Sequence, residues 1–408
     1  MGEYRERVVY ILGAGFSAPL GLPVMSNFLV KAKDLYFRDP DKFTSLEPVL
    51  AAIHRMHAAK TYYSTDLLNI EEVLSISDML DAVGADDMSY DAPDGSLEKV
   101  LVDAAQKALD AGLEDVYEVR IPSKEEVQDF IITVIREYSE RIEVPQEKNI
   151  PEYRGLKPGN LNRSEPLSKI AEHLCTLGMN DNACWLRYLL FACSMLDVRF
   201  GQTPGSGVES GVTEYGVITL NYDLVVERAI RHVEDRLGGL ERSGVKFYQS
   251  DLRLGSSVAV KHLHGDINGE LVAPTWAKLA SEDIRQSWRD AYQMLRDANY
   301  IRVVGYSLPP SDSHVRYLLK AAALESRNLK AFDFIVFDPE GQVERRFNEF
   351  VLLNFRRFKN ARFEEYIPES AASLLTSYPA DGEVVEDKVK YWARFNKLER
   401  HHEKFMNS

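Results

Sequence analysis

Four short polar clusters follow apolar runs in the second half of the chain: TLNYD at 219–223, LHGD at 263–266, GYSLPP at 305–310 and FDPE at 337–340. They offer an amide that can donate and accept hydrogen bonds, and imidazoles that can take a hydroxyl proton near pH 7. His262 and His264 share one face of an extended strand, so spacing alone does not choose between them as a base. Asp223 has a simpler alternative role, which is to cap the helix that follows it.

A glycine-rich turn near the start of the chain supplies a means of holding a phosphate. An apolar run at 8–12 leads into GAGFSA at 13–18, which is the order strand, G-x-G-x-x-A, helix. The first glycine permits a tight turn, the second leaves space for a phosphate, and the small third residue lets helix and strand approach. The sequence therefore predicts a nucleotide site. A Rossmann dehydrogenase is disfavoured because Pro23 interrupts the next segment and Asp34 falls within a helical stretch, not at a strand end.

The elements that must position these residues alternate along the chain. Strand patterns at 8–12, 215–220, 257–263, 300–304 and 332–337 alternate with helical patterns at 223–233, 277–298 and 313–323. Several of the strands are continuous apolar runs, which is typical of a parallel sheet covered on both faces. We therefore expect an α/β fold with a doubly wound, Rossmann-like parallel sheet. Ligands of such sheets bind at the carboxyl ends of strands, so the glycine turn and the four clusters should meet in one crevice.

Helical periodicity dominates from about residue 46 to residue 200, and Asn69 is a plausible N-cap within it. We therefore expect a catalytic domain over 1–45 and 212–365 with a large helical module, 46–211, inserted into it. The charged segment at 384–406 also has a helical pattern, so residues 366–408 are expected to form a C-terminal helical extension.

Composition narrows the classes of protein. The net charge of −14 argues against general affinity for nucleic acid, and no apolar run is long enough to span a bilayer. The polar lead into the first strand is no signal peptide, so we expect a cytoplasmic protein. The three cysteines, Cys175, Cys184 and Cys193, form no C-x-x-C pair, so no metal site is expected.

Five segments together resemble the SIR2 (sirtuin) superfamily. In the family's order they are GAGFSAPLGLP, TLNYD, LHG, GYSL and FDPE, and the resemblance covers roughly residues 5–35 and 215–345. It implies a sheet of SIR2 type, an NAD+ site and cleavage of the nicotinamide–ribose bond. It also implies that Asn221 orients the ribose and a water, and that His264 is the base. The glycine that follows His264 decides between the two histidines.

The resemblance further implies a set of NAD+-binding residues. The family usually carries Asn where this chain has Asp338. The implied set is Gly13, Ala14, Gly15, Phe16, Ser17, Pro23, Thr219, Asp223, Gly265, Gly305, Ser307 and Asp338.

Two departures from the sirtuin deacylases modify the functional expectation. No zinc ribbon of C-x-x-C pairs follows His264, and a long, mainly helical segment separates the glycine turn from TLNYD. This arrangement resembles the SIR2-like proteins of bacterial antiphage defence, which hydrolyse NAD+ to nicotinamide and ADP-ribose. The resemblance implies an NAD+ hydrolase that forms homo-oligomers and works with a separate partner such as a HerA-type ATPase. An NAD+-dependent protein deacylase, a nucleotide-sensing module without turnover and a monomer remain the alternatives.

Overall fold

The computed structural model describes residues 6–59, 69–82, 122–142, 183–201, 213–235, 246–249, 258–269, 271–272, 282–310, 312–350, 355–367, 376–385, 388–394 and 398–408. These residues form two compact units. The first falls within 1–22, 138–270 and 281–408, and the second falls within 23–137 and 271–280. The domain boundaries expected from the sequence stay a prediction.

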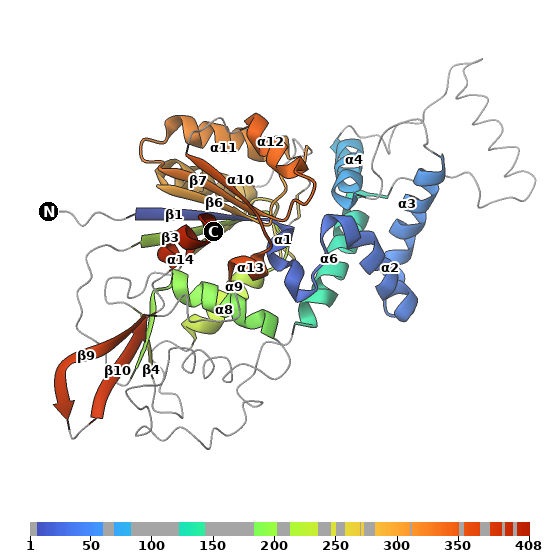
Figure 1. Cartoon of the computed structure of the whole chain (residues 1–408). Coiled ribbons are helices and arrows are strands. Elements are labelled where there is room, and N and C mark those ends of the chain that lie inside the picture. Colours follow the sequence, from blue (N-terminus) through green and yellow to red (C-terminus); the bar gives the residue numbers. More distant parts are fainter. Residues whose placement is uncertain are drawn as a thin grey trace, which may run out of the picture. The chain divides into compact units, whose positions relative to one another are not determined.

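A six-stranded sheet forms the centre of the first unit (Figure 1). Its strands lie in the order β5-β3-β1-β6-β7-β8, and every neighbouring pair is parallel. From β1 the chain builds outward to β3 and β5 on one side and to β6, β7 and β8 on the other. This confirms the predicted α/β fold with a doubly wound parallel sheet. The strands are β1 (Glu6–Leu12), β3 (Thr213–Thr219), β5 (Ala259–His262), β6 (Tyr300–Val304), β7 (Ala331–Val336) and β8 (Arg356–Asn360).

Helices cover both faces of the sheet. Successive side chains of a strand point to opposite faces, so each strand packs against both layers of helices. In β1, Val9 and Ile11 join the core on the side of α10 (Glu282–Asp297), α11 (Ser313–Glu325) and α12 (Gln342–Phe350). Tyr10 faces the other way and packs edge-on against Phe191 of α8, with ring centroids 4.9 Å apart. Figure 1 shows these two layers. The second layer holds α8 (Ala183–Met195), α9 (Val225–Glu234), α13 (Phe363–Tyr366) and α14 (Leu398–Met406).

Buried charges hold the C-terminal helix α14 against this second face. Arg302 of β6 is fully buried, and its guanidinium donates to both carboxylate oxygens of Glu399, at 2.9 and 2.5 Å. The same guanidinium donates to the Tyr10 hydroxyl, which lies 2.9 Å from the Tyr366 hydroxyl. A buried guanidinium needs such partners because an unpaired charge in the interior is costly. Helix α14 is therefore a structural part of the first unit.

A second, antiparallel sheet was not expected from the sequence. Its order is β4-β2-β10-β9, with β2 (Val198–Gly201), β4 (Lys246–Gln249), β9 (Thr376–Val385) and β10 (Lys388–Arg394). The expected helix at 384–406 is therefore wrong over β10 and right only for α14. The segment KVKYWAR alternates only over its first four residues, and the adjacent Tyr391 and Trp392 then break the period of two, so local pattern did not predict a strand there. The sequence analysis also missed β8 and α12.

The second unit is helical where it is described. Its N-terminal caps follow from local sequence: the Asn69 side chain accepts the amide of Glu71 at 3.0 Å, which confirms the predicted N-cap. At the start of α6 (Lys124–Glu140), Ser123 and Glu126 bond each other's backbone amides in a capping box. A short 3-10 turn (Ala18–Leu20) precedes this unit, and two more, Met25–Asn27 and Thr44–Leu46, lie within it. The helices are α2 (Phe28–Arg38), α3 (Glu47–Ala59), α4 (Ile70–Ala82) and α6 (Lys124–Glu140), the last of which ends in the first unit.

Candidate functional site

The glycine turn lies where β1 ends, between the ends of β3 and β6, and it packs directly on the loop that follows β6. The Gly15 amide donates to the Gly305 carbonyl at 2.9 Å, and the Gly13 amide donates to the Val304 carbonyl at 3.0 Å. A Cβ atom on Gly15 would lie 2.9 Å from both the Cα and the carbonyl oxygen of Gly305. The turn was predicted to need glycine for a phosphate. The structure adds a nearer reason, which is the close contact of two backbone segments.

Three predicted residues meet in one hydrogen-bond network beside this turn. Asn221 donates from Nδ2 to the Ser17 hydroxyl at 3.1 Å, and that hydroxyl donates to Asp223 Oδ1 at 3.1 Å. Ser17 comes from the short helix α1 (Ala14–Ser17), whereas the other two follow β3. The backbone amide of Asn221 donates to the Thr219 hydroxyl, and this bond fixes the turn between strand and helix. The network links the glycine turn to the end of β3 through polar side chains.

Asp223 has two functions in this network. Its Oδ1 accepts the amide of Val225 at 3.1 Å, so it caps α9 as its alternative role required. Burial raises the pKa of Asp223 to about 6, although hydrogen bonds from Val225 and Ser17 partly offset that effect. A carboxyl group with this pKa is ionised at neutral pH and can still exchange a proton in the physiological range.

The two candidate histidines lie in different surroundings. His264 is 1% exposed, and its Nε2 lies 3.5 Å from Asp312 Oδ1, while the Tyr306 hydroxyl donates to Asp312 Oδ2 at 2.8 Å. The Tyr222 ring stands edge-on, 6.2 Å away between centroids. A buried carboxylate against one imidazole nitrogen orients the ring and stabilises its protonated form.

His262, by contrast, has both nitrogens against protein oxygens. Its Nδ1 lies 3.1 Å from the backbone carbonyl of Asn221, and its Nε2 lies 2.5 Å from Glu227 Oε1 on α9. Sequence reasoning missed Glu227 and Asp312, although each lies in the first turn or at the N-cap of a helix that follows a predicted cluster. A carboxylate within five residues after a strand-end cluster is the signal that would have found them.

Other predicted binding residues take different positions. Gly265 is buried with φ 76°, a left-handed conformation that favours glycine, and Ser307 is exposed beside the positive-φ residue Leu308. Asp338 caps α12 by accepting the Glu344 amide at 2.8 Å, so its side chain is engaged in the fold. The Phe16 ring packs against Phe363 in the aromatic core, with ring centroids 4.5 Å apart, and Ala14 is the first residue of α1. Pro23 belongs to the second unit.

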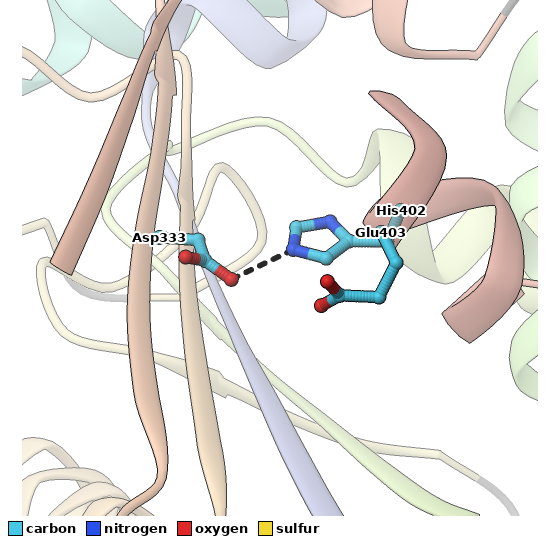
Figure 2. Close-up of side chains that lie close together, drawn as sticks. All are labelled: Asp333, His402 and Glu403. Atoms are coloured by element: carbon cyan, nitrogen blue, oxygen red, sulfur yellow. Dashed lines mark hydrogen bonds and ion pairs between the residues drawn. The ribbon is translucent and has the colours of Figure 1, made fainter. Parts of the chain in front are cut away.

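One group of side chains in the described part of the chain has the composition of a metal site. Asp333, His402 and Glu403 bring one ligand atom each within 4.8 Å of the others, and Figure 2 shows the His402 ring directed at Asp333. Arg357, however, donates to both oxygens of Asp333 at 2.7 Å and to both of Glu403 at 2.7 and 2.8 Å. A metal ion would have to displace this guanidinium, so the cluster fits an anchor for α14 better than a metal centre. The absence of a bound metal stays a prediction. If it is correct, chelators should leave the melting temperature and the activity unchanged.

Comparison with known proteins gives one family match. Residues 216–362 match the family described as SIR2-like domain, which spans β3 to the end of β8 and includes Asn221, His264 and Asp312. This part of the chain is similar to a SIR2-like domain. The match supports a relation to the SIR2 superfamily, and it covers TLNYD, LHG, GYSL and FDPE but not the glycine turn at 13–18. No curated protein sequence matched the chain.

Solved sirtuin structures also match, at low identity. One shows Sir2Tm bound to a propionylated peptide, with 12% identity, 88% of this chain and 90% of that chain covered, and a TM-score of 0.26. Another shows a Sir2 variant with a deacetylated p53 peptide and 3′-O-acetyl ADP-ribose, with 13% identity, 89% and 91% coverage, and a TM-score of 0.30. At these values we transfer neither substrate nor site residues from those proteins. Within the described residues, no helix is both long and apolar enough to cross a membrane.

Proposed function

We propose that this chain is an NAD+ glycohydrolase, in which water replaces nicotinamide at the ribose carbon and ADP-ribose is released. The observation that carries the proposal is the placement of two polar groups at the carboxyl ends of neighbouring strands. One comprises Asn221 and Asp223 after β3 together with Ser17 of α1, and the other comprises His264 after β5 together with Asp312 from the loop after β6. Both groups lie at the same end of the sheet as the glycine turn, which follows β1. Parallel sheets of this type place their ligands there.

The chemistry required is the replacement of one bond by another. The bond between the ribose carbon and the nicotinamide nitrogen breaks, the pyridine ring keeps the electron pair, and an oxocarbenium-like ribose remains. A water oxygen then bonds to that carbon and gives up a proton. In this proposal Asn221 orients the ribose and the water, since an amide both donates and accepts. His264 takes the proton, and Asp312 at 3.5 Å stabilises the resulting imidazolium.

The alternative substrates differ in what attacks the ribose. In a deacylase the nucleophile is an acyl-lysine oxygen, and the sirtuin deacylases carry a zinc ribbon after the catalytic histidine. This sequence has Asp266-Ile267-Asn268-Gly269 at that place, and its three cysteines form no C-x-x-C pair. Water is therefore the favoured nucleophile. A sensing module without turnover is disfavoured because it would need no base such as His264.

The biological setting is proposed from the resemblance alone. We propose that the protein is an NAD+-depleting effector of bacterial antiphage defence in the cytoplasm, that it forms a homo-oligomer, and that a HerA-type ATPase is its partner. Light scattering of the purified protein tests the first assembly step, because a monomer throughout the micromolar range would contradict it. Co-purification with the product of a neighbouring gene tests the partner.

The decisive experiment is to incubate the purified protein with NAD+ alone and to measure free nicotinamide by chromatography. We expect release without any peptide, and a loss of about 10²–10⁴-fold in rate for Asn221→Ala and for His264→Ala, as for other positioned acid–base groups. Asn268→Ala and His54→Ala are matched controls, because both side chains are exposed and lie outside the network. Near-normal turnover by Asn221→Ala or His264→Ala would refute the assignment. Release that depends on an acylated peptide would favour the deacylase.

A further inference from the structure

His262 lies at the end of the edge strand β5, where its backbone pairs with Thr219 in β3. From there its ring reaches two protein oxygens at once, the backbone carbonyl of Asn221 at 3.1 Å and Glu227 Oε1 at 2.5 Å. The His262 side chain is 12% exposed and that of Glu227 is 23% exposed, so the pair is largely shielded from solvent. The ring thus bridges the turn after β3 and the first turn of α9.

The chemistry of the two oxygens determines the state of the ring. A backbone carbonyl can only accept a hydrogen bond, and so can an ionised carboxylate. Both contacts are made at once only when each ring nitrogen carries a hydrogen, which is the imidazolium form. A neutral ring would set a nitrogen lone pair against one of the two oxygens. The geometry therefore selects the charged form of His262.

The His262 ring contacts the backbone carbonyl of Asn221, whereas the backbone N–H and the side chain of Asn221 have other partners. The Asn221 amide donates to the Thr219 hydroxyl and its Nδ2 donates to the Ser17 hydroxyl, each at 3.1 Å. With the carbonyl held by His262, the residue is fixed at three points. Among the described residues, none donates to its Oδ1, so that oxygen is available to a ligand.

We propose that His262 and Glu227 form a charged clamp that positions Asn221 for the reaction. This inference rests on the proposed function, since it assigns a positioning residue to the same site. It also explains why two histidines stand so close together in the sequence. His264 is left to act as the base, whereas His262 cannot accept a proton while both of its nitrogens donate.

The charges around His262 support its protonated form. Burial by itself would lower the pKa of His262, but the hydrogen bond and negative charge of Glu227, together with Asp266 and the Asn221 carbonyl, raise it above 6.5. Asp223 also lies near enough to interact with it. Since a raised pKa means that the proton is lost only at higher pH, the clamp should persist to a higher pH than that at which an ordinary histidine loses its proton, and should open above that pH.

Glu227→Gln separates the clamp from general effects of mutation. Its amide can donate to an unprotonated Nε2, while the Nδ1 hydrogen of a neutral His262 still reaches the Asn221 carbonyl. The variant therefore keeps the geometry without needing the charge. Glu234→Gln is the matched control, because it removes the same charge from the same helix, about two turns further along.

Nicotinamide release is measured against pH for all variants. In the wild type we expect kcat to fall at alkaline pH as His262 loses its proton, and in Glu227→Gln we expect this alkaline fall to disappear. His262→Ala should lower kcat about 10-fold with KM within about twofold, the size expected for losing a hydrogen bond from a charged group. Glu234→Gln should keep the wild-type profile.

A second readout does not depend on turnover. In the full chain with labelled histidine and asparagine, nuclear magnetic resonance should show Asn221 backbone signals that titrate together with His262, and a lower His262 pKa in Glu227→Gln. If Asn221 follows His262 but no nicotinamide is released, the clamp stands and the glycohydrolase proposal fails. The clamp is overturned if nicotinamide is released but the Asn221 backbone signals do not change as His262 titrates. It is also overturned if kcat of Glu227→Gln falls at high pH as it does in the wild type.

Discussion

Adding one carbon at Gly15 should destabilise the folded protein even when no ligand is bound. In Gly15→Ala the new Cβ would lie 2.9 Å from both the Cα and the carbonyl oxygen of Gly305. Neither neighbour is a flexible side chain, and the Gly15 amide already bonds that same carbonyl at 2.9 Å. One of the two loops must therefore move by several tenths of an ångström, which weakens the hydrogen bond that joins them.

The size of the effect follows from three contributions. Overpacking a tight contact costs about 1–3 kcal/mol, and weakening the hydrogen bond adds up to about 1 kcal/mol. The stiffer unfolded chain of an alanine variant returns about 0.4–1 kcal/mol. We therefore expect a net loss of about 1–3 kcal/mol. Gly305→Ala should lose more, because its Cβ would overlap the Phe16 amide nitrogen and its φ of +64° is unfavourable for alanine by about another 1–2 kcal/mol.

Thermal melting of the full chain without ligand tests the reasoning. Gly305→Ala should melt lowest, Gly15→Ala next, and the control Gly269→Ala close to the wild type, because a Cβ at Gly269 meets nothing within 4 Å. NAD+ affinity is measured on the same samples. A Gly15→Ala variant that melts with the wild type but binds NAD+ weakly would refute the packing argument. It would return the glycine to the role predicted from the sequence, space for a phosphate.

Three further predictions concern single side chains. Glu399→Ala leaves the buried Arg302 guanidinium without its carboxylate and should cost about 3–5 kcal/mol in a denaturation experiment, whereas Glu364→Ala on the adjacent helix α13 should cost far less. Asp312→Asn removes the charge 3.5 Å from His264 and should lower kcat for nicotinamide release about 10-fold or more, while an unchanged kcat would exclude Asp312 from the site. Because the pKa of Asp223 is raised to about 6, folding favours its protonated form, and this contribution to stability is lost as pH rises from about 4 through 6. Asp223→Asn should therefore reduce the fall in melting temperature over that range, and an unaltered pH dependence would contradict the cause.

The sequence by itself determined where the strands end and which polar residues stand there. Apolar runs, a glycine turn and the residues after each strand are local signals, so Asn221, Asp223 and Ser17 could be chosen as candidates before their distances were known. The choice of His264 over His262 came from the resemblance to the SIR2 superfamily. The doubly wound, parallel class of the sheet also followed from the alternation of strands and helices, whereas the order of the strands came only from the structure. Local pattern failed at β10, where only four residues alternate and the high charge of the segment suggested a helix.

Only the tertiary structure decided how these residues are paired. Asp312 approaches His264 from the loop after β6, and Glu227 approaches His262 from α9, so each partner arrives from a different element. The sequence left the two histidines on one face of a strand. What distinguishes them is that one contacts a single carboxylate and the other bridges two acceptors. The need for glycine at position 15 likewise comes from Gly305, a residue from the opposite half of the sheet, because backbone contacts between distant segments leave no local trace in the sequence.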